Sequence, residues 1–366
     1  MGEVCTLERG VRVVRKDLQE IGLFPVFQNS LTPLGYFEKS NYPAHTPFVI
    51  CAGAAGEVGF SDVPFWAADD CTCVICNPYI VSKYTYYYLL VKQHALKSQV
   101  RKASVPRLSK TVIEKIDIPI PSLDEQKRIV SILDTFTDSI ENLKQQIAQR
   151  RKQFEFYRDQ LLDLEGKEGV EMKTLGEVLV SLKTGLNPRK NFVLNSPNSN
   201  NYYITVRELG LFDIKPTDKT DKVTDEALLL INNRSNLESG DVLFSGTGTI
   251  GRTALVKETP NNWNIKEGVY TLKPRKNLIN SRYLIELLHS NIIIKKIDAL
   301  VVGDPIRSIP MKSFVLIPIP LPPLPEQQRM VSLLDTFEAS ITNLEAQLEQ
   351  RQKQYEYYRN KLLTFE

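Results

Sequence analysis

The sequence predicts an α+β protein in which two pseudo-symmetric globular domains are separated by two long antiparallel coiled-coil helices. The first observation is a repeat: residues 125–165 and 326–366 agree at roughly 24 of 41 positions, with a fixed offset of about 200 residues. The second is an apolar seam that both copies share, and the third is the short linker after the first copy. A repeat near half the chain length indicates a duplicated unit related by a two-fold axis.

Each repeat predicts a helix with one apolar stripe. Apolar residues recur in steps of four and three, which is the a/d pattern of a coiled coil. Arg150 and Arg351 interrupt the pattern at equivalent places, where a polar residue fixes register at a cost in stability. We expect helices on the order of 60 Å long that pack on each other. The seam residues are Leu133, Phe136, Ile140, Leu143 and Ile147 in the first copy, and Leu334, Phe337, Ile341, Leu344 and Leu348 in the second.

Proline-rich segments and the linker predict the boundaries. Both helices follow the sequence IPIP, at residues 118–121 and 317–320, and these prolines exclude helix. Because residues 166–171 can span at most roughly 20 Å, the second domain must begin near the end of the first helix, so the helices are antiparallel. The predicted parts are a first domain (1–121), a first helix (122–165), a linker (166–171), a second domain (172–321) and a second helix (322–366).

The two domains share a plan but differ in most side chains. Residues 1–4 align with 175–178, residues 56–59 with 248–251, and residues 82–84 with 281–283 at the head of an apolar helical run. Alternating apolar residues with many Gly and Pro breaks predict small α+β or mostly β domains. This divergence is expected if each domain recognises something different.

Composition indicates a soluble, cytoplasmic protein. Of the 366 residues, 42% are hydrophobic and 24% charged, without a membrane-length apolar run or a signal-peptide core. The five cysteines are then expected as free thiols. The net charge of +3 permits nucleic-acid binding only through local basic clusters.

Two motifs invite a chemical interpretation. Cys71, Cys73 and Cys76 have a spacing that suggests a metal site, but buried thiols in a strand are favoured because a second Cys pair is missing. The glycine-rich residues 245–251 suggest a phosphate cradle, but they lack the Gly-Lys-Ser/Thr of a P-loop, so a tight turn is favoured. We predict neither catalytic residues nor a metal.

Local basic and amide clusters predict DNA contacts. Arg, Lys, Asn and Gln hold phosphates or read base edges. Solvated surface charge is the competing interpretation for any one of them. The candidates are Arg9, Arg12, Arg15, Lys16, Gln28, Asn29, Arg101, Lys102 and Arg107 in the first domain, and Lys183, Arg189, Lys190, Arg207, Thr247, Arg252 and Arg307 in the second.

Together these features resemble the specificity subunit of a type I restriction–modification system, over essentially the whole chain. The motif that carries the resemblance is the proline-rich lead-in followed by EQKRIVSILD at residues 125–134, which returns as EQQRMVSLLD at residues 326–335. The resemblance implies two target recognition domains, each binding one half of a bipartite double-stranded DNA sequence, with the helices setting the gap between the halves.

The resemblance also implies partners. The subunit has no catalysis or cofactor of its own. It recruits two methylation subunits and restriction subunits, on which S-adenosylmethionine, ATP and magnesium are expected. Exposed helix residues that recur in both copies are the expected docking points: Glu125, Gln126, Arg128 and Asp134, with Glu326, Gln327, Arg329 and Asp335. Helix capping and charge pairing are the alternative roles for these residues.

A protein–protein scaffold with two binding domains on a coiled-coil spacer is the competing function. A stand-alone nuclease or methyltransferase is disfavoured, because the sequence offers no catalytic constellation.

Overall fold

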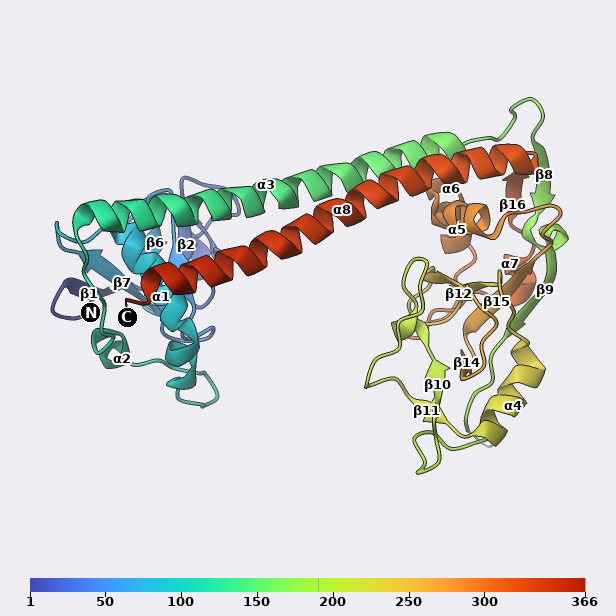
Figure 1. Cartoon of the computed structure of the whole chain (residues 1–366), viewed down its shortest axis with the longest axis horizontal. Coiled ribbons are helices and arrows are strands. Elements are labelled where there is room, and N and C mark those ends of the chain that lie inside the picture. Colours follow the sequence, from blue (N-terminus) through green and yellow to red (C-terminus); the bar gives the residue numbers. More distant parts are fainter. Residues whose placement is uncertain (190, 366) are drawn as a thin grey trace. The chain divides into compact units, whose positions relative to one another are not determined.

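Two structural units make up the chain in the computed structural model, which describes residues 1–189 and 191–365. The first unit comprises residues 1–146 and 344–366, and the second comprises residues 147–343. The two repeats form long helices, α3 (Leu123–Leu162) and α8 (Leu324–Leu363), as predicted (Figure 1). Each unit therefore contains one globular part together with a segment of both helices.

Strands and two helices form the globular part of the first unit. The α1 helix follows β7, and α2 precedes the proline-rich segment that leads into α3. The elements are β1 (Cys5–Arg9), β2 (Phe24–Phe27), β3 (Gly35–Phe37), β4 (Pro47–Ile50), β5 (Val58–Phe60), β6 (Trp66–Ala67), β7 (Cys71–Cys76), α1 (Ser82–Ser98) and α2 (Lys110–Glu114), with a 3-10 turn at Arg15–Asp17.

The globular part of the second unit follows a similar chain order, with additions. The elements are β8 (Glu171–Thr174), β9 (Leu179–Thr184), β10 (Asn201–Ile204), β11 (Lys222–Val223), α4 (Asp225–Ser235), β12 (Val242–Ser245), β13 (Thr253–Leu255), β14 (Trp263–Ile265), β15 (Val269–Pro274), α5 (Ser281–His289), α6 (Asn291–Asp298), α7 (Met311–Phe314) and β16 (Pro318–Leu321), with 3-10 turns at Leu175–Val178 and Val206–Glu208.

Sheet topology is the same in the two units. The first has a four-stranded antiparallel sheet in the order β1-β7-β4-β5, and the second has β9-β15-β12-β13. Each also has a three-stranded sheet, β3-β2-β6 and β11-β10-β14, whose last pair is parallel. The predicted duplication and α+β fold are thus confirmed. The α4 helix distinguishes the units, because the equivalent residues 38–46, all described, contain no helix.

Backbone pairing confirms the alignment of residues 1–4 with 175–178. Gly2 N–H donates to Glu114 O at 3.0 Å, and Gly176 N–H donates to Val315 O at 2.8 Å. The proline-rich segments differ, however. Residues 318–321 form β16, which pairs with β8, whereas residues 118–121 form no strand.

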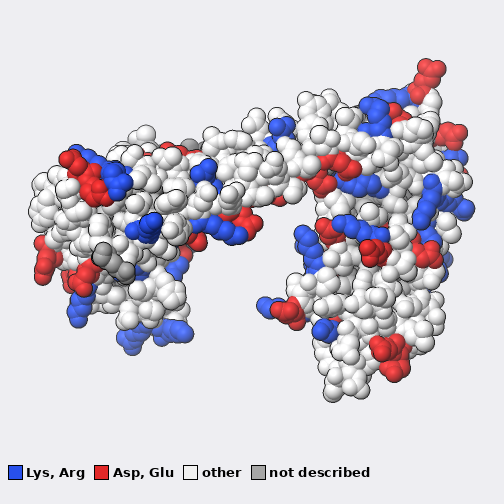
Figure 2. Space-filling view, viewed as in Figure 1, with Lys and Arg blue, Asp and Glu red and all other residues white. Residues whose placement is uncertain are grey.

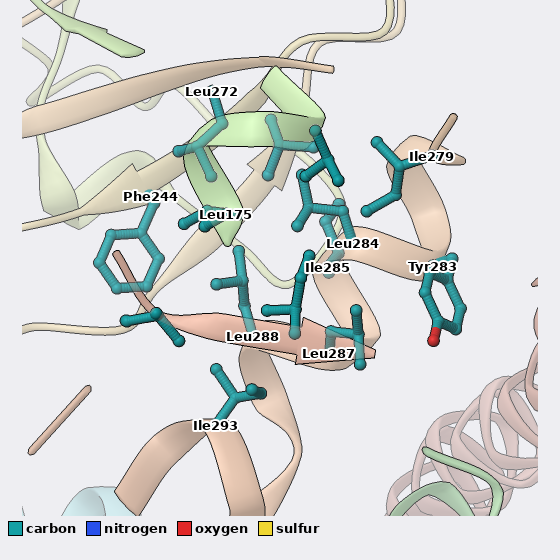
Figure 3. Close-up of a cluster of buried hydrophobic side chains, with 14 of the residues drawn as sticks. Leu175, Phe244, Leu272, Ile279, Tyr283, Leu284, Ile285, Leu287, Leu288 and Ile293 are labelled. Atoms are coloured by element: carbon teal, nitrogen blue, oxygen red, sulfur yellow. The ribbon is translucent and has the colours of Figure 1, made fainter. Parts of the chain in front are cut away.

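Helix segments complete the core of each unit. In the second unit, Phe244 and Leu272 of the sheet pack with Leu284 and Leu288 of α5 (Figure 3), and Met330 of α8 belongs to the same cluster. In the first unit the buried tyrosines of α1 play the equivalent part: Tyr84, Tyr87 and Tyr88 pack with Ile129, Leu133 and Leu363. Burial of this apolar area fixes the globular part on the helices.

Within each unit the two helix segments run antiparallel. In the first unit Leu133 packs with Leu363, whereas Phe136, further along α3, stacks on Tyr358, which is earlier in α8. In the second unit Tyr157 lies 5.3 Å from Phe337, centroid to centroid. The predicted seam residues are buried or half-buried, while most residues between them are exposed. Supercoiling of the helices stays a prediction.

Candidate nucleic-acid interface

A glycine turn stands at the same edge of the main sheet in both units. In the first, Ile50 N–H donates to Glu57 O and Gly56 N–H donates to Ile50 O, both at 2.8 Å. In the second, Ser245 makes the same two bonds, with Arg252 O and Gly251 N–H. The sequence alignment of residues 56–59 with 248–251 is therefore wrong by three positions. An alternation of apolar residues does not show how two turns align when the side chains of the turns differ.

Positive φ angles explain the glycines of this turn. Gly53 and Gly248 have φ of 81° and 78°, and Gly56 and Gly251 have 87° and 93°. Glycine adopts such angles without steric cost, unlike residues with a Cβ. The two turns thus share a backbone but carry different side chains.

A second loop docks on each turn. In the first unit Gly53 N–H donates to Pro106 O at 3.2 Å, and Ala52 bridges Arg107. In the second unit Gly248 N–H donates to Arg307 O at 2.8 Å, and Thr247 bridges Ser308. Residues 101–107 and 302–307 are exposed. We call each turn with its docked loop the paired loops: residues 51–57 with 101–107, and 246–252 with 302–308.

Predicted basic residues gather at the paired loops of the first unit. Arg101 and Arg107 bridge each other across the docked loop, and Lys102 is exposed beside them. Arg9, at the end of β1, lines a pocket with Arg107 and with Lys110, which the sequence analysis missed. That pocket measures about 180 Å³, below the roughly 300 Å³ of small-molecule sites. Figure 2 shows Lys and Arg gathered over the segment that follows α1. Asp69 and Asp70 line the same pocket, so basic and acidic side chains meet at this edge of the sheet.

In the second unit, Thr247, Arg252 and Arg307 belong to the paired loops, and Arg252 contacts the 3-10 turn that carries Arg207. Arg252 Nη1 donates to Val206 O at 3.2 Å, and Val206 precedes Arg207 in the chain. The Arg307 carbonyl accepts from Gly248 N–H in the glycine turn. Arg207 also lies 3.4 Å from the Asp221 carboxylate. All three arginine side chains are exposed.

Other predicted residues are placed at the same edge or outside it. Gln28 Nε2 donates to the Asp70 carboxylate at 3.4 Å, and Asn29 O accepts from Ala54 N–H in the first turn, so both lie at this edge. Four predicted residues lie in exposed or half-exposed segments outside the paired loops: Arg12, Arg15, Lys16 and Arg189. Lys183 is on β9 opposite Thr271. Lys190 lies outside the described residues.

Two of the expected docking residues are buried, so the expectation that they are exposed is wrong. Gln126 is 0% exposed: its Oε1 accepts from Val81 N–H at 2.8 Å. Its Nε2 donates to Tyr79 O and Pro121 O, at 3.1 and 2.9 Å. Gln327, also 0% exposed, makes the equivalent three bonds in the second unit. These glutamines hold their own domains onto the helices, a role that a helical pattern cannot reveal.

The other six docking candidates are at least partly exposed. Exposed bidentate pairs join Glu125 to Arg128 and Glu326 to Arg329, at distances from 2.6 to 2.8 Å. These pairs lower the pKa of each glutamate. Asp134 lies 3.0 Å from Lys83 and Asp335 lies 3.1 Å from Arg282, so both aspartates also join helix to domain.

The two chemical motifs are structural in this fold. Ser245 Oγ donates to Thr249 O at 2.6 Å and accepts from Arg252 N–H at 2.8 Å, so this hydroxyl is turned into the glycine turn. Cys71 and Cys73 are buried in β7, and burial raises the pKa of both thiols. Among the described residues, no helix is both long and apolar enough for a membrane span.

Comparison with known proteins assigns the family. The family model for the type I restriction modification DNA specificity domain matches residues 1–150 and 167–353. The EcoR124I/EcoR124II specificity subunit of Escherichia coli is 34% identical over 298 residues, which are 77% of this chain and 70% of that protein. A putative specificity subunit of Haemophilus influenzae is 29% identical, covering 82% and 77%.

Solved structures share the fold. The S subunit of a type I restriction–modification system from M. genitalium has a TM-score of 0.62 at 18% identity, covering 100% of this chain and 95% of that one. A chain from a study of complex assembly in the type I system has a TM-score of 0.63 at 18% identity, covering 99% and 95%.

The chain has the two-fold repeated fold of a DNA specificity protein. It belongs to the type I restriction modification DNA specificity family. As a specificity subunit, it is a recognition component and not the catalytic one.

Proposed function

We propose that the paired loops of each unit bind one half of a bipartite double-stranded DNA sequence. The observation that carries this proposal is a duplicated backbone arrangement whose exposed docked loops carry basic residues, Arg101, Lys102 and Arg107 in the first unit and Arg307 in the second, among otherwise different side chains. Arginine and lysine fix the duplex through phosphates, while neighbouring polar groups read base edges. Different loops on one scaffold then give two different half-sites.

The repeated helices set the gap between half-sites and dock the methylation subunits. Docking requires exposed features that recur in both copies, because the same partner binds twice. One such feature is an aromatic pair: Phe156 is 57% exposed against Tyr157, and Tyr357 is 58% exposed against Tyr358. Exposed aromatic side chains held by a rigid neighbour are typical anchors of protein interfaces. S-adenosylmethionine, ATP and magnesium then belong to the methylation and restriction subunits.

The docking assignment is tested with Phe156→Ala combined with Tyr357→Ala. Loss of an aromatic anchor should weaken binding of the methylation subunits about tenfold or more. Leu229→Ala is the control, because Leu229 is 62% exposed on α4, away from the helices. Unchanged binding of the double variant would remove the aromatic pairs from the interface.

The recognition assignment is tested by sequencing modified adenines in a genome that expresses the chain with its methylation subunits. We expect one bipartite motif, and substitutions in the paired loops of one unit should change one half only. Methylation without a bipartite preference would contradict the proposal. The alternative, a protein–protein scaffold, would give no salt-dependent DNA binding at all.

A further inference from the structure

Two cysteines of the first unit lie side by side on neighbouring strands. Cys5 of β1 is directly opposite Cys76 of β7 in the antiparallel register, and the Cys5 thiol donates a hydrogen bond to Cys76 Sγ at 3.7 Å. Opposed residues of such a ladder have Cα atoms about 4.5–5.5 Å apart, within the range that a disulfide spans. Bridging these two residues therefore requires no movement of the strands.

The two thiols differ in burial and in pKa. Cys76 is half-buried and lies 3.4 Å from Thr85 Oγ1 in the first turn of α1. The hydrogen bond from Cys5 lowers the pKa of Cys76 to about 7, whereas that bond and burial raise the pKa of Cys5. Burial also raises the pKa of Cys51, Cys71 and Cys73. Because the thiolate is the nucleophile and Cys5 is buried while Cys76 is only half-buried, we expect Cys76 to react first.

We propose that Cys5 and Cys76 are an oxidation site that forms a reversible disulfide with a low-molecular-weight disulfide such as oxidised glutathione. The Cys76 thiolate attacks one glutathione sulfur, and the S–S bond breaks to release one glutathione thiolate. Cys5 then gives its proton to that thiolate and attacks Cys76 Sγ, which displaces the second glutathione. Two protein thiols are oxidised, and one glutathione disulfide is reduced to two thiols.

A disulfide between Cys5 and Cys76 would connect β1 to residues 77–81, which are bound by Gln126 of α3. Cys5 N–H donates to Met1 O at 3.0 Å, and Cys76 leads into residues 77–81, where Gln126 binds Tyr79 and Val81. The paired loops stand at the other end of these strands, where Arg9 faces Thr72. The second unit has Leu179 opposite Pro274 on its equivalent strands, so oxidation acts on the first unit alone.

Peptide mapping of the full chain, equilibrated in a series of glutathione redox buffers, tests the proposal. We expect loss of two hydrogens from a linked Cys5–Cys76 peptide pair, with Cys51, Cys71 and Cys73 still alkylatable after unfolding. Oxidation should raise the unfolding midpoint of the first unit by about 5 °C or more, and dithiothreitol should reverse the rise. A disulfide between any other cysteines, or none, would overturn the proposal.

Single substitutions test the order of events. Cys5→Ser should accumulate a stable glutathione adduct on Cys76, because the resolving thiol is missing, whereas Cys76→Ser should form no adduct on Cys5. Cys51→Ser is the matched control, since Cys51 is also half-buried and should leave the bridge unchanged. In the unsubstituted chain, Cys76 should alkylate fastest at pH 7, a readout that does not depend on the variants folding. Faster alkylation of another cysteine would contradict the assignment.

Discussion

Single buried side chains join each globular part to its helices. The side chains of Gln126 and Gln327 each accept a hydrogen bond from one backbone N–H and donate to two backbone carbonyls, and both side chains are buried. Tyr84 and Tyr283 repeat the pattern, since their hydroxyls donate to Pro119 O and Pro320 O. Buried polar groups left without partners are costly, so these side chains stabilise the junction between each globular part and its helices.

Gln126→Ala should destabilise the first unit by about 2–4 kcal/mol, because three buried backbone groups lose their partner. Trp66 and Trp263, one in each unit, allow each unfolding transition to be followed in a Trp→Phe background. Urea unfolding with Trp66 fluorescence measures the loss. The control is Glu125→Gln, on an exposed pair, which should change stability by less than about 1 kcal/mol. Equal effects of the two substitutions would contradict the role of Gln126.

His289 should make the second unit sensitive to acid. Burial, with Arg158 and Arg282 nearby, lowers the pKa of His289 to about 4. The unfolded chain then binds the extra proton at higher pH than the folded chain, so stability should fall as pH drops from about 6.5 towards 4. Burial raises the pKa of Glu286 and Glu338, which act in the opposite direction. Comparing His289→Gln with the unsubstituted chain isolates the histidine: the variant should lose less stability between pH 7 and 5. Parallel pH profiles would exclude this role.

At the scale of the elements, the long helices α3 and α8 and the paired loops have different roles. Arg150 lies over the Phe337 ring at 6.0 Å and Arg351 over the Phe136 ring at 5.7 Å, so each seam arginine contacts an aromatic residue of the facing helix. This placement agrees with a role in register, since each arginine has one matching ring. The paired loops, by contrast, contribute exposed charge.

Arg307→Ala should weaken DNA binding and reduce the salt dependence of the affinity by about one unit of slope, because one phosphate contact is lost. Binding isotherms across a range of salt concentrations measure the slope. Lys276→Ala is the control, because Lys276 is exposed in the loop after β15, at the opposite end of the sheet. An equal loss in both variants would indicate a general charge effect and would contradict a localised interface.

For the whole molecule, the duplicated units are most similar in their long helices and differ in the side chains of their paired loops. The helices share roughly 24 of 41 aligned residues, as the proposed docking of one kind of partner on both copies requires. The paired loops keep the backbone and change the side chains, as the proposed recognition of two different half-sites requires. This division predicts that spacing and recognition can be altered independently.

Insertion of one heptad into both helices, between Gln146 and Ile147 and between Asn343 and Leu344, should lengthen the gap between half-sites and leave both half-sites unchanged. Seven residues add about 10 Å, or about three base pairs. Sequencing modified adenines reads both quantities together. A two-residue insertion in each helix is the control, because it turns the apolar seam about 200° away from the facing helix and should abolish methylation by the assembled subunits. A change in half-site identity after the heptad insertion would contradict the division of roles.

Much of the fold could be predicted from the sequence by itself. The repeat, the seam and the proline-rich segments determined two long helices and a duplicated α+β plan, because periodic burial leaves a periodic pattern. The strand with Cys71 and Cys73, and the helical runs after residues 82 and 281, were likewise predicted.

Only the tertiary structure decided which residues meet. The paired loops join segments about 50 to 60 residues apart through backbone hydrogen bonds, which leave no side-chain pattern. Gln126 and Gln327 were expected on the surface because a glutamine on a helix is usually exposed; docking of the domain buries them. The contact of Cys5 with Cys76 is likewise set by strand register. Periodicity determined the elements, whereas register and docking between distant segments determined the site.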